Sequence, residues 1–142
     1  MSSGPRSVSV EIDLRLIVPD GSSRPVRCEA SYDRDDPYAV RLGFHTGPEV
    51  VEWTFARSLL TDGVTHAVGD GDVRVWPASA DGRPGVCLAL SSPFGQALFE
   101  APLTPIVQFL SHSYQLVPTG SEGDFVDLDA ELAALLWSER DA

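Results

Sequence analysis

Three aspartates and a histidine form the densest group of potentially reactive side chains in the sequence. Asp33, Asp35 and Asp36 lie within the four residues DRDD, and His45 follows nine residues after Asp36. Carboxylates and imidazoles bind metals and transfer protons, so this stretch could hold a metal ion or an acid–base pair. Asp36 directly precedes a proline, which is a turn signal. The stretch could therefore equally be a polar turn before a strand.

The spacing does not fit a calcium-binding loop. A loop that began at Asp33 would need glycine at its sixth position and glutamate at its twelfth. The sequence has Tyr38 and Phe44 at those positions. We therefore expect the three aspartates to be solvent-exposed turn residues that bind no metal. A metal or acid–base site is the less favoured alternative.

Other motifs that could carry chemistry also fail on spacing. The serines of SSPFG, residues 91–95, lie between two predicted strands and lack the G-x-S-x-G pattern of a nucleophile elbow. GDGD, residues 69–72, has acids where a phosphate-binding loop needs open backbone N–H groups and a lysine. His66 and His112 are isolated. The sequence thus predicts no catalytic, cofactor-binding or metal-binding residue, and no enzyme activity.

The charge balance separates this chain from typical nucleic-acid-binding proteins. The sequence has 21 acidic residues against 10 basic ones, which gives a formal net charge of −11, and all ten cations are arginines. A phosphate-binding face needs clustered lysine and arginine, whereas these arginines are spread from Arg6 to Arg140. We therefore expect no nucleic-acid ligand.

The length and composition predict one domain without a membrane segment. The 142 residues, 43% of them hydrophobic, fit a single domain over 1–142, with 1–6 and 138–142 as flexible ends. No apolar run reaches the roughly 20 residues that cross a bilayer, and the N-terminus lacks a signal-peptide pattern. Cys28 and Cys87 lie in strand-like patterns and are expected to be reduced core thiols. These features favour a cytoplasmic protein that does not insert into membranes.

Alternation of apolar and polar residues with a period of two predicts about seven strands. The predicted strands cover 7–18, 26–32, 38–44, 50–55, 73–77, 86–92 and 96–101. Most are joined by short polar turns, which favours an antiparallel meander. The strand at 86–92 is apolar on both faces and is therefore expected to be central and covered on each side.

Two main helices and one short helix are predicted to pack on this sheet. The first main helix covers 104–118, with Thr104 as N-cap and Pro105 at the first helical position. The second covers 127–137 and has a leucine stripe at helical spacing. A short helix at 56–63 would end with Gly63 just beyond its last turn. The predicted fold class is α+β, with one antiparallel sheet of about seven strands and two main packed helices.

Two tryptophans are candidates for packing or recognition. Trp53 shares a strand face with Val51 and Phe55, so we expect it in the core. Trp76 shares a face with Arg74. This pair is typical either of a surface that a helix covers or of a subunit interface. Arg74 and Trp76 are therefore weak candidates for an oligomer interface, and the residues that bind other partners are not indicated.

Five segments together resemble a known family. They are, in chain order, DPYAVRLGFHTG, VEWTFARSLLTDG, GDVRVWP, LSSPFGQALFEAP and FVDLDAELAALL. In this order they are similar to the signature blocks of the SsgA-like family of sporulation-specific cell division proteins, and they cover most of residues 7–137. The absence of lysine and asparagine suits the GC-rich actinomycetes in which that family occurs.

The resemblance implies a fold similar to the whirly proteins, trimeric binders of single-stranded nucleic acid built from a sheet and packed helices. It thus implies a homo-oligomer, most simply a trimer. The acidity of this chain opposes the nucleic-acid ligand of the whirly proteins. A whirly-type regulator that binds single-stranded nucleic acid is therefore kept only as the alternative.

The resemblance also implies a role in cell division rather than catalysis. One member of the family helps to place the tubulin-like division protein FtsZ at sporulation septa, and none is an established enzyme. We therefore expect a non-enzymatic regulator or adaptor without cofactors, which is recruited to division septa. Its expected partners are FtsZ or a membrane-anchored septation factor.

Overall fold

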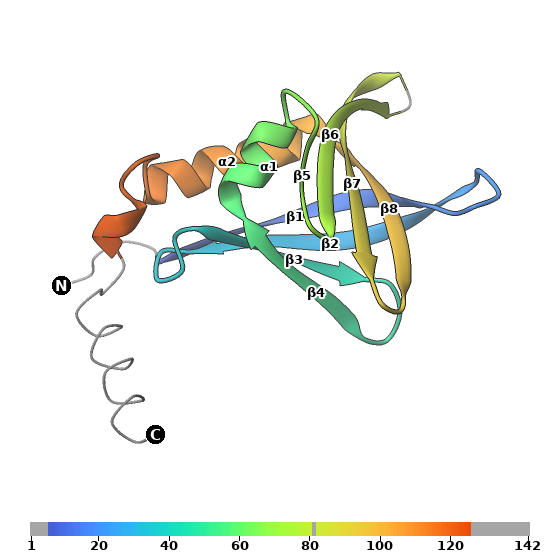
Figure 1. Ribbon diagram of the computed structural model, residues 1–142, viewed down its shortest axis with the longest axis horizontal. Coiled ribbons are helices and arrows are strands. Elements are labelled where there is room, and N and C mark those ends of the chain that lie inside the picture. Colours follow the sequence, from blue (N-terminus) through green and yellow to red (C-terminus); the bar gives the residue numbers. More distant parts are fainter. Residues whose placement is uncertain (1–5, 81, 126–142) are drawn as a thin grey trace.

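One strongly curved antiparallel sheet forms most of the computed structural model, which describes residues 6–80 and 82–125 (Figure 1). Its eight strands follow the order β4-β3-β2-β1-β8-β7-β6-β5. The strands are β1 (Ser7–Ile17), β2 (Ser23–Asp33), β3 (Ala39–His45), β4 (Val50–Ala56), β5 (Val68–Asp70), β6 (Val73–Ala80), β7 (Arg83–Ser92) and β8 (Gly95–Pro102). The helices are α1 (Arg57–Gly63), α2 (Leu103–Leu116) and the short 3-10 helix η1 (Glu122–Phe125).

The topology is the predicted meander, with one additional strand. Most neighbouring strands are consecutive in the chain and antiparallel, and the pairing of β1 with β8 joins the N-terminal and C-terminal halves of the sheet. The additional strand is β5, which pairs Val68 with Val75 and Asp70 with Val73. Our prediction of about seven strands missed it because it has three residues, and its Gly-Asp composition is typical of a turn. As predicted, β7 lies between two other strands and is buried over most of its centre.

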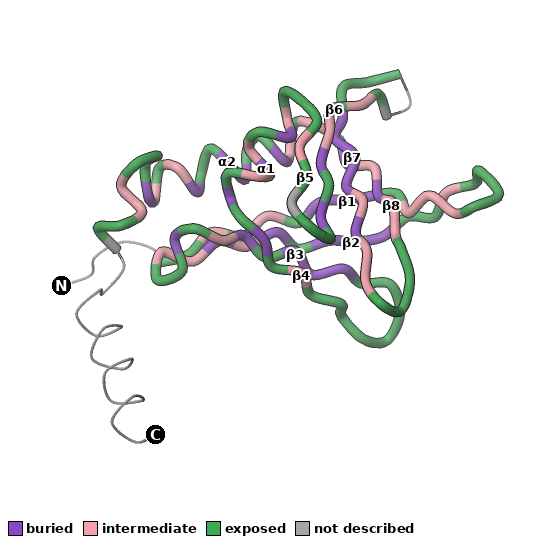
Figure 2. Tube along the Cα trace, viewed as in Figure 1, coloured by how far each residue is buried: buried purple, intermediate pink, exposed green. Residues whose placement is uncertain are grey.

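Apolar residues that alternate with polar residues in the sequence are buried in the core, as predicted. In β1, Ile12 and Leu14 are buried whereas Glu11 and Asp13 are exposed. Buried residues occur in both halves of the sheet, as the purple segments of the trace show (Figure 2). In the core, the rings of Phe44 in β3 and Phe99 in β8 stack, with their centroids 4.4 Å apart. Because β2 and β1 separate these two strands in the sheet, this contact requires the sheet to curl.

Helix α2 covers part of this core. It contacts β1, β2, β7 and β8, and it buries Ile106, Phe109 and Leu110 in the core. The helix begins at Leu103 with Pro102 as its N-cap, so the prediction of Thr104 as N-cap was wrong. β8 runs directly into the helix, and Pro105 therefore lies in its third position, where the first four N–H groups have no helical acceptor in any case.

Helix α1 connects β4 to β5, and its last residue corrects another prediction. Gly63 is the final helical residue and not the residue beyond the helix, which is Val64 in a right-handed conformation. A Cβ atom at Gly63 would lie 2.5 Å from the Cβ of Val75 in β6. The glycine is thus required because α1 lies close against β6.

The second predicted main helix, at 127–137, lies outside the described residues, as do residues 1–5 and 138–142 of the predicted flexible ends. Arg6, the remaining residue of the predicted N-terminal end, is described, and its carbonyl accepts a hydrogen bond of 2.8 Å from the N–H of Arg34. In the described ranges, no helix is long and apolar enough to cross a membrane.

Candidate interaction surface

The structure separates the aspartates of the opening cluster from His45. Asp33 ends β2, and its Oδ1 accepts a hydrogen bond of 2.8 Å from the N–H of Asp35 within the turn to β3. His45 lies at the opposite end of β3, across from Arg27. Asp35 and Asp36 are exposed as predicted, whereas Asp33 is half-buried because it still pairs in the sheet. Residues 6–80 and 82–125 contain no cluster of three His, Cys, Asp or Glu side chains that could hold a metal.

The serines of the β7–β8 hairpin serve the turn. Ser92 Oγ accepts a hydrogen bond of 3.2 Å from the N–H of Phe94 and donates one of 3.4 Å to the carbonyl of Gly95. In the described part of the chain, no hydrogen bond joins Ser91 or Ser92 to a histidine. This arrangement holds the hairpin tip in place and does not activate a hydroxyl for nucleophilic attack.

Both cysteines are buried and unpaired, as predicted. Burial raises the pKa of Cys28 to about 12, and it raises the pKa of Cys87 as well. The thiolate is the reactive form of cysteine. The two thiols are therefore protonated core side chains near neutral pH.

Arg57 is the one fully buried charged side chain among the described residues. Its guanidinium lies between two aromatic rings, with Cζ 4.6 Å from the ring centroid of Tyr32 and 4.0 Å from that of Tyr114. The Tyr32 hydroxyl donates a hydrogen bond of 2.8 Å to the carbonyl of Pro37, and burial raises the pKa of Tyr32 to about 12. The faces of the two rings thus stabilise a cation that has lost its hydration.

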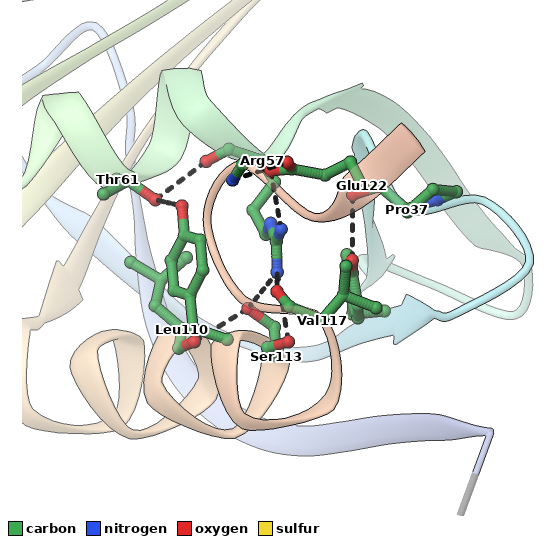
Figure 3. Close-up of polar contacts among 10 residues, drawn as sticks. Pro37, Arg57, Thr61, Leu110, Ser113, Val117 and Glu122 are labelled. Atoms are coloured by element: carbon green, nitrogen blue, oxygen red, sulfur yellow. Dashed lines mark hydrogen bonds and ion pairs between the residues drawn. The ribbon is translucent and has the colours of Figure 1, made fainter. Parts of the chain in front are cut away.

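The guanidinium also joins three parts of the chain (Figure 3). Nη1 donates to the carbonyls of Ser113 and Val117 at the end of α2, at 3.0 and 2.9 Å. Nη2 donates to the carboxylate of Glu122 in η1 at 2.8 Å. Hydrogen bonds from its own backbone N–H and from Arg57 lower the pKa of Glu122. Arg57 therefore satisfies carbonyls at the end of α2 from outside the helix and fixes η1 against it.

The role of Arg57 was not predicted from the sequence, although its position in the alternating pattern gave a signal. Trp53, Phe55 and Arg57 follow one another at a spacing of two, and the first two point inward. The arginine that continues this phase therefore also points inward. Because every polar contact of its guanidinium is internal, we assign Arg57 to the architecture and not to a binding site.

An apolar pocket opens at the end of the interior that the β3–β4 and β7–β8 turns surround. Its volume is about 280 Å³, and strands from both halves of the sheet contribute to its wall. The lining residues are Leu16, Phe44, Thr46, Val51, Trp53, Leu90, Ser92, Phe94, Gly95, Gln96, Ala97 and Phe99. Trp53 is half-buried, packs against the core and also lines this pocket, so the prediction of core packing was correct in part.

Two large apolar side chains that line this pocket are exposed. Phe94 at the tip of the β7–β8 hairpin is 99% exposed, and Val51 in β4 is 47% exposed. Apolar side chains that gather on a protein surface mark interaction sites more often than single ones do. We call the pocket together with these two exposed residues the apolar mouth.

Arg74 and Trp76 lie elsewhere, on the outer side of β6. Together with residues of the α1–β5 and β5–β6 connections they line an open groove of about 680 Å³. Arg74 is exposed and Trp76 is half-buried. No helix of the described ranges lines this groove, and both alternatives for Trp76, a covering helix and a subunit interface, stay predictions.

Comparisons with known proteins agree with this architecture. A curated relative from Frankia casuarinae, named sporulation-specific cell division protein SsgB, is 55% identical over 132 residues, which are 92% of each chain. A solved structure of an SsgA-like sporulation-specific cell division protein from Thermobifida fusca is 50% identical, with a TM-score of 0.83 over 94% of this chain and 98% of that one. A second solved structure comes from work on mutations in SsgB that correlate to longitudinal cell division during sporulation of Streptomyces coelicolor. It is also 50% identical, with a TM-score of 0.81 over 84% of this chain and 94% of that one.

The family itself is recognised over most of the sheet and both α-helices. The sequence model described as "Streptomyces sporulation and cell division protein, SsgA" matches residues 26–122, which run from β2 to Glu122 of η1. The first four of the five segments that resembled this family in the sequence build β3, β4, α1, β6 and the β7–β8 hairpin, whereas the fifth lies outside the described residues except for its first residue. On these matches the chain belongs to the SsgA family of sporulation and cell division proteins.

Proposed function

We propose that this protein is a non-enzymatic adaptor of sporulation-specific cell division, which helps to localise FtsZ or the septum site. The observation that carries this proposal is the family match over residues 26–122, together with relatives at 50–55% identity that are named sporulation-specific cell division proteins. The architecture adds support, because in residues 6–80 and 82–125 no three His, Cys, Asp or Glu side chains gather into a metal site, while an apolar surface is exposed. An adaptor requires such a surface and no reactive centre.

Charge constrains how such an adaptor could meet its partner. This chain has a net charge of −11, and we expect FtsZ to be acidic too, so long-range attraction does not bring the two together. Affinity then has to come from a small surface of apolar, aromatic or arginine side chains. The apolar mouth and the groove beside Arg74 and Trp76 are two surfaces of this kind.

We further propose that the protein acts as a homo-oligomer, most simply a trimer with a whirly-like arrangement of sheets. Trp76 is half-buried on an outer sheet face that no helix of the described ranges lines. A second copy that packed there would bury the indole beside Arg74, a combination enriched at interfaces. This leaves the apolar mouth, on another part of the molecule, for a division partner.

Two-colour imaging in a sporulating actinomycete that carries this gene tests the proposal. A fluorescent fusion of the protein should form septal bands that coincide with FtsZ and appear no later than the FtsZ bands. A fusion carrying Trp76→Glu provides the test of oligomerisation and should lose the bands. A uniform cytoplasmic signal, from a fusion that supports normal sporulation as the only copy, would contradict the proposed localising role.

A further inference from the structure

The two edges of the sheet differ in their protection. β5 is three residues long and continues from the loop after α1, so it offers little backbone for pairing. β4 extends over seven residues, from Val50 to Ala56, and in the described part of the chain it pairs only with β3. It contains no proline and no lysine, two residues that commonly prevent pairing at an edge. The outward N–H and C=O groups of β4 are thus available to a further strand.

The space beside β4 is closed at one end and open at the other. Helix α1 follows β4 directly and contacts β4, β5 and β6, so it spans the opening between the two sheet edges near Ala56. At the other end of β4, Val51 and Trp53 line the apolar mouth, and the exposed ring of Phe94 lies on the same pocket. A strand added to β4 would therefore run directly along the rim of this pocket.

The size of the pocket favours side chains over a cofactor. Its volume of about 280 Å³ lies just below the range of about 300–1,000 Å³ that holds drug-sized ligands. The lining is mainly apolar, so it offers few groups that could orient a polar ligand. One or two aliphatic or aromatic side chains of a partner would fill such a space.

The charge on β4 indicates which partner residue should lie between the partner side chains that fill the pocket. Glu52 is the only charged residue of β4 and is exposed. It lies between Val51 and Trp53 in sequence and therefore on the opposite face of the strand. A residue paired opposite Glu52 shares its face, while the neighbours on either side point toward the pocket. A cation opposite Glu52 and apolar residues beside it would match this edge.

We propose that β4 and the apolar mouth bind an extended segment of a partner protein as an additional strand, with the pattern apolar–Lys/Arg–apolar. Backbone hydrogen bonds to β4 supply affinity, and the pocket and Glu52 supply specificity, as in other recognition by strand addition. The biological meaning of this site rests on the proposed adaptor role, but its binding chemistry does not. A second copy of this chain or its own segment 126–142 would be the competing occupants.

Selection from a displayed library of random nine-residue peptides tests the proposal on the full chain without assuming a partner. The selected peptides should share the apolar–Lys/Arg–apolar pattern and lack proline within it, because proline cannot pair with β4. N-methylation of alternate amides in a selected peptide should abolish binding for one of the two phases only. Amide hydrogen exchange should slow in β4 on binding.

Single substitutions distinguish the contribution of the pocket to peptide binding from the contribution of the charge on Glu52. Val51→Asp and Phe94→Ser should weaken a selected peptide at least about tenfold, because they change exposed residues of the pocket and not the core. Glu52→Arg should weaken a lysine-containing peptide about fivefold and favour its glutamate counterpart. The matched controls are Val107→Asp, an exposed valine on α2, and Glu11→Arg, which changes the net charge equally on β1. Both controls should leave binding unchanged.

Several results would overturn the proposal. These are selection of no common pattern, equal effects of Glu52→Arg and Glu11→Arg, or exchange that slows elsewhere but not in β4. An oligomer that dissociates on Val51→Asp would assign the edge to a second copy instead. If the peptides share the pattern but the protein does not co-localise with FtsZ at septa, the adaptor role is refuted and the strand-binding site stands. If the protein co-localises but no pattern is selected, the strand-binding site is refuted and the adaptor role stands.

Discussion

Arg57 shows how one residue can organise the junction between β4, α2 and η1. Its guanidinium is 1% exposed, lies between two tyrosine rings and donates to two carbonyls and one carboxylate. Only arginine combines a flat face for stacking with several donors in one plane. The Nε atom has no hydrogen-bond partner, so these contacts do not satisfy the side chain completely. Removing it should nevertheless take the side-chain donor from the Val117 carbonyl and the ion-pair partner from Glu122.

We expect Arg57→Met to lower the free energy of unfolding by about 3 kcal/mol, because the substitution removes the guanidinium that donates to the Val117 carbonyl and to the Glu122 carboxylate. Urea unfolding followed by circular dichroism measures this change. Arg41→Met, on the exposed face of β3, is the control and should change the free energy by less than about 0.5 kcal/mol. Equal effects of the two substitutions would show that the buried contacts do not contribute.

The lowered pKa of Glu122 leads us to expect that the stability of the fold depends on pH in the acidic range. Because its pKa in the folded protein is lowered from 4.5, its carboxylate stabilises the fold above that pH, and this contribution disappears as the pH falls through the folded pKa. Glu122→Gln should therefore be less stable than the parent at pH 7, and the difference should shrink below pH 4.5. Thermal unfolding across this pH range measures it. A difference that stayed constant with pH would contradict the assigned ion pair with Arg57.

At the scale of elements, the alternating patterns predicted most strands because the period of two survives in β1, β2 and β3, whereas β7 was recognised as a strand that is apolar on both faces. What could not be predicted is how the sheet curls. The pairing of β1 with β8 has no local signature, and the pocket combines residues from five strands. The apolar mouth therefore could not be predicted from the sequence, although Trp53 and the turn that contains Phe94 were each considered within their own segments. The boundaries of both α-helices shifted because neighbouring strands run directly into them.

A substitution at Gly63 tests how tightly α1 packs on β6. Gly63→Ala would place a methyl group against Val75, and we expect it to lower the free energy of unfolding by about 1–3 kcal/mol. Val75→Ala in the same chain should recover part of this loss, since it removes the atoms that clash. Gly47→Ala has no atom within 4 Å of the added carbon and serves as the control. A helix-stabilising effect of Gly63→Ala would contradict the close approach.

At the scale of the whole molecule, the acidic charge, the curled sheet and the exposed apolar surfaces together favour assembly with other proteins. A net charge far from zero favours solubility, and its negative sign opposes nucleic-acid binding. Two separate surfaces, the apolar mouth and the groove beside Arg74 and Trp76, allow one to serve a second copy and the other a partner. The family match assigns the chain to proteins of sporulation and cell division.

Light scattering tests the proposed self-association. The protein should have about three times its chain mass of 15.3 kDa, and Trp76→Glu should reduce this to a single chain because it places a charge in the interface. Val107→Glu, at an exposed position of α2, should leave the mass unchanged. A parent protein that elutes and scatters as a 15.3 kDa species would rule out the trimer.

Co-sedimentation with polymerised FtsZ from the same organism, across a series of salt concentrations, tests the central claim most directly. We predict that the protein pellets with the polymers and that the bound fraction stays constant or rises slightly with salt, because salt screens the repulsion between two acidic proteins. Binding that collapsed as salt increased would replace the apolar contact with an ionic one. Absence of the folded protein from the pellet at every ionic strength would contradict direct recruitment of FtsZ.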